Sequence, residues 1–359
     1  MTDDKNSSAT AVNRRGSSGG GDAGRDRGSQ PNGDAEPDSP TDVSAPGWFA
    51  ILRRSLKGFK TDNLSDWAAA LTYYGVLALF PGILVVVSVL GLLGPHAIAT
   101  IQQNVGQVAP GGVKSFFNQI IANAQGQHAT ASLTAIIGLV LALWSASGYI
   151  AAFMRAINAI YGVGEGRPVW KTIPVRVGVT LAVVVMLLMS AVIVLVSGPV
   201  AEQVGKALGV GNTGLTVWNI AKWPVLLILV ALTLAILYWA CPNVKQPGFR
   251  WLSPGAAVAV VIWVVASGAF AVYVANFASY NKTYGSVAGV IVFLVWLWIT
   301  NLAVLLGAEF DAELDRQKAI AQGVPESLEP FAVPRDTSKL DAEDTQRAEA
   351  LSRRRSQSD

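Results

Sequence analysis

Residues 285–308, GSVAGVIVFLVWLWITNLAVLLGA, decide the fold, because this stretch is long, strongly apolar and free of charged side chains. An α-helix rises about 1.5 Å per residue, so about 20 such residues cross the roughly 30 Å hydrocarbon core of a membrane. The sequence therefore predicts an all-α, polytopic membrane helix bundle with six transmembrane helices. The other five apolar runs occupy residues 67–93, 131–154, 175–198, 219–241 and 254–277.

The composition also indicates a membrane protein. Of the 359 residues, 52% are hydrophobic and only 14% are charged, and the mean hydropathy is +0.41. A soluble domain cannot bury that much apolar surface. The single cysteine, Cys241, excludes a disulfide framework or a cysteine-rich zinc site within one chain, and we interpret it as a small packed apolar residue.

The distribution of Lys and Arg predicts the orientation of the bundle. Cytoplasmic loops carry an excess of these residues, so both termini are expected in the cytoplasm and the protein in the cytoplasmic membrane. The basic residues on the predicted cytoplasmic side are Arg53, Arg54, Lys57, Lys60, Arg155, Arg167, Lys171, Arg176, Lys245, Arg250, Arg316 and Lys318. The opposite side holds only Lys114, Lys206, Lys222 and Lys282, although its first loop is the longest.

The two ends of the chain are polar. Residues 1–46 are rich in Gly, Ser, Asp and Pro, and they lack the apolar side chains that would offset the entropy of ordering. We therefore expect a disordered cytoplasmic tail there, with the first membrane helix as the targeting signal. Residues 47–316 form the predicted membrane domain, and residues 317–359 are predicted to be a second disordered cytoplasmic tail.

Two further segments are amphipathic. Residues 47–60 place Trp48, Leu52, Leu56 and Phe59 at helical spacing among basic residues. This pattern fits an interfacial helix on an anionic leaflet, and it equally fits a connector whose apolar face packs on the bundle. The predicted extracytoplasmic loop, residues 94–130, is expected to form a helical hairpin against the outer membrane surface.

Several segments occur together in a recognisable order. They are residues 67–87 (WAAALTYYGVLALFPGILVVV), 143–161 (LWSASGYIAAFMRAINAIY), 238–243 with 250–255 (YWACPN and RWLSPG), and 276–316 (NFASYNKTYGSVAGVIVFLVWLWITNLAVLLGAEFDAELDR). Together they resemble the YihY/BrkB family of bacterial inner-membrane proteins. The resemblance implies six membrane helices and a poorly defined activity, with the label ribonuclease BN attached to many such sequences and a link to serum resistance and virulence.

Ionisable residues near the ends of the spans are the first candidates for function, because charge is costly in a bilayer. Arg155 and Asn158 share a face at the end of the second predicted helix, and Glu309 and Glu313 share a face at the end of the sixth. One hypothesis is that Arg155 and Glu309 form part of a cytoplasmic gate or of a site for a charged substrate. The alternative, which we prefer, is a membrane anchor at Arg155 and a structural ion pair at Glu309.

A second group of candidates is aromatic and amide-rich. Tyr73 and Tyr74 precede Pro81, which is expected to kink or break the first predicted helix. Transporters often coordinate substrates at broken helices lined by such groups, although tyrosines at span ends also form ordinary aromatic belts. The connection between the fifth and sixth spans contributes Asn276, Tyr280 and Asn281 to this candidate substrate path.

The sequence predicts no catalytic residues, no metal site and no cofactor. It has no Walker loop, and His96 and His128, its only histidines, both fall in the predicted extracytoplasmic loop. The sequence lacks the pattern of basic residues interleaved with aromatic residues that is typical of a nucleic-acid groove, so nucleic acid is not an expected partner. The expected partners are membrane lipids and a small solute or lipid substrate.

Three functions remain open from the sequence. The leading one is transport or lipid handling in the cytoplasmic membrane, and the protein is not expected to be an enzyme. The alternatives are a membrane-associated ribonuclease acting in tRNA processing, which rests on the family label, and an envelope scaffold protein. The pair Gly285 and Gly289 can pack within one chain or between subunits, so an oligomer is compatible with the sequence.

Overall fold

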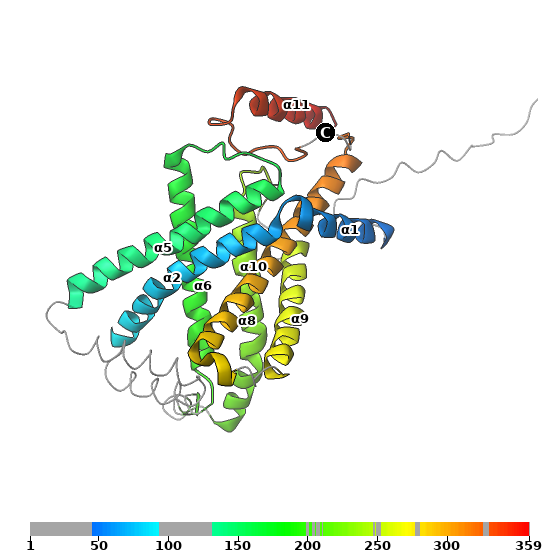
Figure 1. The fold of residues 1–359 in the computed structure, drawn as a ribbon. Helices are drawn as coiled ribbons and strands as arrows, with labels where there is room; N and C mark the ends of the chain where they lie inside the picture. The colour runs from blue at the N-terminus through cyan, green and yellow to red at the C-terminus, as the bar shows by residue number, and fades with distance from the viewer. Residues whose placement is uncertain are drawn as a thin grey trace, which may run out of the picture. The chain divides into compact units, whose positions relative to one another are not determined.

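The computed structural model describes residues 45–92, 131–198, 211–246, 253–276, 281–325 and 330–358, with a few isolated positions between them. The helices are α1 (Ala45–Thr61), α2 (Leu64–Leu92), α5 (Ala131–Ile160), α6 (Val169–Leu195), α8 (Asn212–Ala240), α9 (Pro254–Asn276), α10 (Asn281–Ala321) and α11 (Ala342–Ser358) (Figure 1). The described residues add one isolated β-bridge, between Val244 and Pro334.

The all-α, multi-span prediction is confirmed. Helices α2, α5, α6, α8, α9 and α10 cover the six predicted runs. Within the described residues, five of these helices are long and apolar enough to cross a membrane, namely α5, α6, α8, α9 and α10. Helix α2 occupies the first predicted run and is not among the five, so the count of six spans is approximate.

The outward faces of the bundle are apolar. Only 11% of the α6 span and 6% of the α9 span are buried within the protein. Exposed side chains on these helices include Leu187, Val192 and Val265. A protein in water would not leave such faces uncovered, whereas hydrocarbon accommodates them at no cost.

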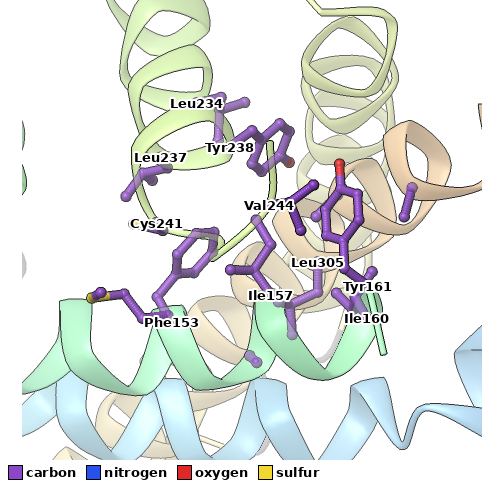
Figure 2. Close-up of a cluster of buried hydrophobic side chains, with 14 of the residues drawn as sticks. Phe153, Ile157, Ile160, Tyr161, Leu234, Leu237, Tyr238, Cys241, Val244 and Leu305 are labelled. Carbon is purple, nitrogen blue, oxygen red and sulfur yellow. The ribbon is translucent and has the colours of Figure 1, made fainter. Parts of the chain in front are cut away.

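The packed core lies where α5, α8 and α10 meet. Phe153 and Ile157 of α5 lie in one buried cluster with Leu237 of α8 and Leu305 of α10 (Figure 2). Cys241 is fully buried in the same cluster, which confirms its interpretation as a packed apolar residue. Burial raises the pKa of the Cys241 thiol to about 12, so the thiol stays protonated at neutral pH.

Helices α9 and α10 are in close contact at glycine residues near the N-terminus of α9. The sequence RWLSPG, residues 250–255, explains why α9 begins there. Ser253 caps the helix by accepting a hydrogen bond from the Ala256 N–H (3.0 Å), and Pro254 takes the first helical position. The Gly255 N–H donates to Asp311 Oδ1 of α10 at 2.7 Å. A side chain at Gly255 would collide with the Gly307 carbonyl, so glycine allows this close approach.

Helix α2 is continuous from Leu64 to Leu92, so the chain does not break at Pro81, and the alternative of a kink stays a prediction. Proline removes one helical hydrogen bond, but a membrane strongly favours keeping all the others inside the helix. Pro174 in α6 and Pro224 in α8 are tolerated inside helices in the same way.

Helix α1 packs on the bundle along one side and leaves apolar side chains exposed on another, and its position at the membrane interface stays a prediction. Ile51 is buried against Phe310 and Leu314 of α10, as expected of a connector that packs on the bundle. Leu52 and Leu56 are 45% and 61% exposed on another side, as expected of a helix at the membrane interface.

The predicted disorder of the C-terminal tail is wrong for the residues that the structure describes. Helix α10 continues to Ala321, and α11 follows at Ala342–Ser358. Leu351 of α11 is buried with Ala319, Val324 and Val333. The tail is polar on average, but these few apolar residues are enough to pack α11 against the end of α10. The N-terminal tail up to residue 44 and the predicted hairpin at 94–130 lie outside the described residues.

Candidate functional site

A cavity of about 540 Å³ lies where α1 meets α10 and the chain that follows α5. We call it the α1–α10 cavity. Basic and acidic side chains both line it, which is rare beside apolar spans. The charged lining residues are Arg54, Lys57, Asp62, Glu309, Glu313 and Arg316, and Tyr161 and Phe331 add aromatic rings.

Glu309 is the most deeply buried charged residue of this cavity. It is 3% exposed, and it follows the apolar run of α10 directly. Its neighbours include the carboxylates of Asp62 and Glu313. Glycine at position 58 of α1 makes room for it, since an added Cβ there would lie 2.0 Å from Glu309 Oε1.

Tyr161 closes one side of the cavity. Its hydroxyl lies 3.5 Å from Asp315 Oδ2, and its ring lies 6.3 Å from the ring of Phe331. Burial, followed by the nearby carboxylates of Asp315 and Asp311, raises the pKa of Tyr161 well above its usual range. The hydroxyl therefore remains a hydrogen-bond donor at every physiological pH.

The structure does not bring Arg155 and Glu309 together. Among the described residues, these two side chains form no ion pair. The Arg155 guanidinium instead lies over the ring of Tyr74, 5.8 Å from its centre. Tyr73 is exposed and meets Tyr74 edge to face, with the ring centres 5.4 Å apart. Arg155, Tyr73 and Tyr74 thus form a separate aromatic and cationic cluster.

Asn158 belongs to a buried polar network. Its side-chain Nδ2 donates to Glu165 Oε2 (3.0 Å), and its Oδ1 accepts from the Asn243 N–H (2.7 Å). Glu165 also receives Nε and Nη2 of Arg167, at 2.6 and 2.7 Å. The buried Arg167 donates to the carbonyl of Cys241 at 2.7 Å. This network joins the α5–α6 loop to the end of α8.

The C-terminal segment docks on that network. Asn243 Nδ2 donates to the Asp336 carbonyl (2.8 Å), and its Oδ1 accepts from the Asp336 N–H (3.0 Å). Lys171 Nζ pairs with Asp336 Oδ2 at 2.6 Å. The Lys171 ammonium, with Ser338, holds the pKa of Asp336 well below its usual range. Residues 330–340 are therefore part of the bundle end and also supply Phe331 to the cavity.

A second buried polar contact was not identified from the sequence. The Tyr149 hydroxyl donates to Asn301 Oδ1 at 2.8 Å, and Asn301 Nδ2 donates to Thr72 Oγ1 at 3.1 Å. These bonds tie α5, α10 and α2 together inside the apolar region. Asn301 is the one side-chain amide in the run 285–308. A single amide in an apolar span needs a hydrogen-bond partner, so its presence could have predicted this contact.

The remaining sequence candidates lie where side chains are not described. Pro81 and Asn276 are in helical backbone, Asn281 begins α10, and Tyr280 is outside the described residues altogether. Within the described part of the chain, no group of three or more His, Cys, Asp or Glu residues is placed to hold a metal ion.

The other half of the α1–α10 cavity was not predicted from the sequence. In the sequence, Arg54, Lys57 and Arg316 indicate only the orientation of the bundle, and no pattern assigns a role to Asp62. The usable signal was Gly58, a glycine inside an amphipathic helix, since glycine there weakens the helix unless something approaches closely.

Known proteins resemble this chain along most of its length. YfkH of Bacillus subtilis (strain 168), which is named as ribonuclease-like, is 28% identical over 280 residues, covering 77% of this chain and 99% of that protein. The UPF0761 membrane protein RSc1559 of Ralstonia nicotianae is 29% identical over 289 residues, or 76% of this chain and 60% of the relative. The UPF0761 membrane protein PBPRA3489 of Photobacterium profundum is 28% identical over 280 residues, or 75% and 82%.

No solved structure matches the chain. The family described as virulence factor BrkB matches residues 55–329, which include α2 to α10 and the C-terminal part of α1. That range holds five of the described helices that can cross a membrane, together with the α1–α10 cavity except for Arg54 and Phe331. The chain is a membrane protein and belongs to the virulence factor BrkB family.

Proposed function

We propose that this protein is a lipid-handling transport protein of the cytoplasmic membrane, and that the α1–α10 cavity receives the polar headgroup of the lipid. One observation carries the proposal. Helix α1 lines the cavity with Arg54, Lys57 and Gly58, and it exposes Leu52 and Leu56 elsewhere on its surface. Basic residues beside an apolar strip are typical of a helix that lies among lipid headgroups.

The cavity suits a headgroup in size and in chemistry. Small-molecule sites typically enclose about 300–1,000 Å³, and this cavity has about 540 Å³. Its basic residues can bind a phosphate, which carries negative charge on several oxygens. The exposed apolar faces of α6 and α9 supply a surface along which acyl chains can lie.

The positive-inside rule supports a cytoplasmic position for the cavity. Arg54, Lys57 and Arg316 all belong to the side of the bundle on which basic residues are concentrated. On this proposal the lipid enters from the inner leaflet, and both termini of the protein are cytoplasmic.

A ribonuclease is the alternative suggested by the name of the Bacillus subtilis relative. One of the acidic residues that such an activity would need has a structural task, because Asp311 accepts the hydrogen bond that begins α9. We therefore propose a protein without enzymatic activity. Trimming of precursor tRNA by the purified protein would contradict that proposal.

The test is lipid translocation in proteoliposomes that contain headgroup-labelled phospholipids. Lys57→Gln removes an exposed charge of the cavity, so translocation should fall about two- to fivefold, the effect of one partly solvated charge contact. Lys60→Gln is the matched control, because Lys60 is exposed on the same helix and does not line the cavity.

Two results would count against the proposal. One is translocation no faster than in protein-free vesicles, which a scaffold protein would give. The other is an equal loss in the Lys57→Gln and Lys60→Gln variants, which would show that α1 attracts anionic lipid without using the cavity.

A further inference from the structure

The α1–α10 cavity contains a buried carboxylate that the described residues leave incompletely satisfied. Glu309 is 3% exposed and lines the cavity, and its Oε2 has no hydrogen-bond partner among the described residues. Buried polar atoms almost always have a partner, and each exception calls for an explanation such as a functional role or a bound water, ion or ligand. This oxygen is therefore available to a hydrogen-bond donor that comes from outside the chain.

Helix α1 is fitted closely around this carboxylate. A Cβ at position 58 would lie 2.0 Å from Glu309 Oε1 and 3.3 Å from Asp62 Oδ2. A side chain at position 58 would displace the Glu309 carboxylate and crowd that of Asp62. Glycine destabilises a helix interior relative to alanine, so its presence favours a role in placing these oxygens.

The charges that face Glu309 come from two helices and one turn. The carboxylates are Asp62, in the turn between α1 and α2, and Glu313, one turn further along α10. The basic side chains Arg54, Lys57 and Arg316 also line the cavity, and Tyr161 lies across it. Neighbouring carboxylates repel one another unless a cation or a shared proton lies between them.

We propose that Glu309, together with Asp62, binds a primary ammonium group, and that the ligand is the headgroup of an aminophospholipid. An ammonium group has three donors, enough for Glu309 Oε2 and one oxygen of Asp62. The basic residues of the same cavity then bind the phosphate that lies a few bonds away in such a headgroup. A bare metal ion would leave most of the 540 Å³ unfilled. This inference rests on the proposed function and specifies its substrate class.

The test uses the full-length chain in detergent and measures binding by calorimetry. The probes are short-chain soluble phosphatidylethanolamine, short-chain phosphatidylglycerol, and free phosphoethanolamine. Phosphatidylethanolamine should bind about tenfold or more tightly than phosphatidylglycerol, and Glu309→Gln should abolish that preference, because a hydrogen bond to a charged group is lost. Glu349→Gln is the control, since Glu349 is an exposed carboxylate of α11, and its binding should match the unmodified protein.

Thermal unfolding without ligand separates a binding role from a structural one. Glu309→Gln removes one of several neighbouring negative charges, so its unfolding temperature should be unchanged or higher. A lower unfolding temperature together with lost binding would indicate a structural ion pair and overturn the inference. Asp62→Asn, in the turn after α1, provides a second variant and should weaken phosphatidylethanolamine severalfold.

The other outcomes distinguish the two proposals. Equal binding of the two lipids, unaffected by Glu309→Gln, would overturn the ammonium site and leave lipid handling standing. Phosphoethanolamine binding as tightly as the lipid would support the ammonium site and overturn a lipid as its source. No binding of any probe would overturn the ammonium site, and the translocation assay would then decide the proposed function alone.

Discussion

Asn243 shows how much one residue can hold together at the end of the bundle. It is fully buried, and its backbone N–H donates to Asn158 Oδ1. Its side chain bonds the backbone of Gly164 and both backbone groups of Asp336. Its carbonyl accepts from the Arg335 N–H at 2.9 Å. The hydrogen bonds of this one residue therefore join the α5–α6 loop, the loop after α8 and the C-terminal segment.

Replacing this amide should be costly. Asn243→Ala would remove three hydrogen bonds from the partly buried backbone groups of Gly164 and Asp336 and empty a fully buried position, so we expect a loss of about 2–4 kcal/mol of unfolding free energy. The measurement is equilibrium unfolding in detergent. Asn219→Ala is the control, because Asn219 is exposed on α8, and it should change stability by less than about 0.5 kcal/mol. Similar losses in both variants would contradict the network's role.

Among the helices, the contact of α9 with α10 sets the position of the acidic end of α10. A Cβ on Gly307 would lie 2.5 Å from the Gly255 carbonyl oxygen and 2.6 Å from the Ala259 Cβ. Neither of these neighbours is the tip of a flexible side chain. The two helices can approach this closely only with glycine at the crossing.

Gly307→Ala should therefore force α9 away from α10, at a cost of about 1–3 kcal/mol. The expected result is a lower thermal unfolding temperature and a weakened cap of Asp311 on α9. Gly178→Ala in α6 is the matched control, because no atom lies within 4 Å of the added methyl group. That variant should be stabilised by about 0.5–1 kcal/mol through helix propensity. Equal effects at both glycines would show that the crossing carries no strain.

The helices could be predicted from the sequence, whereas the cavity could not, and the reason is physical. A membrane-spanning helix depends on the length of a local apolar run, so the runs at 219–241 and 254–277 predicted α8 and α9 closely. The cavity depends on α1 packing against a residue far along the chain, Glu309, and on a tail that adds Phe331. The sequence shows which charged residues are present, but only the folded bundle brings them close together.

In the molecule as a whole, the C-terminal segment docks over the same end of the bundle as the α1–α10 cavity. Asp336 holds it through Lys171 and Asn243, and Leu351 anchors α11. Phe331, at the start of this segment, lines the cavity, and its ring lies at a tilt beside that of Tyr161. Release of the segment would therefore remove one wall of the cavity.

Lys171→Gln should loosen this docking. The Lys171 ammonium lowers the pKa of Asp336 in the folded protein, so the ion pair stabilises docking above the unfolded pKa, about 3.9. That contribution is lost only as the pH falls through the folded value. Limited proteolysis should thus show a tail protected equally at about pH 5 and pH 8, and cut faster after Arg335 in Lys171→Gln. Opening of the unmodified tail between those two pH values would contradict this role of Asp336.

The orientation of the whole bundle decides whether the cavity can meet the inner leaflet. Single cysteines in a Cys241→Ala background test it, with Glu349→Cys on α11 and Asn212→Cys at the start of α8, both exposed positions. A membrane-impermeant maleimide applied to intact cells should label only Asn212→Cys, and both should react after the membrane is opened. Labelling of Glu349→Cys in intact cells would place the cavity on the outer side. A lipid could then be taken only from the outer leaflet, and the basic residues around Glu309 would need an explanation other than the positive-inside rule.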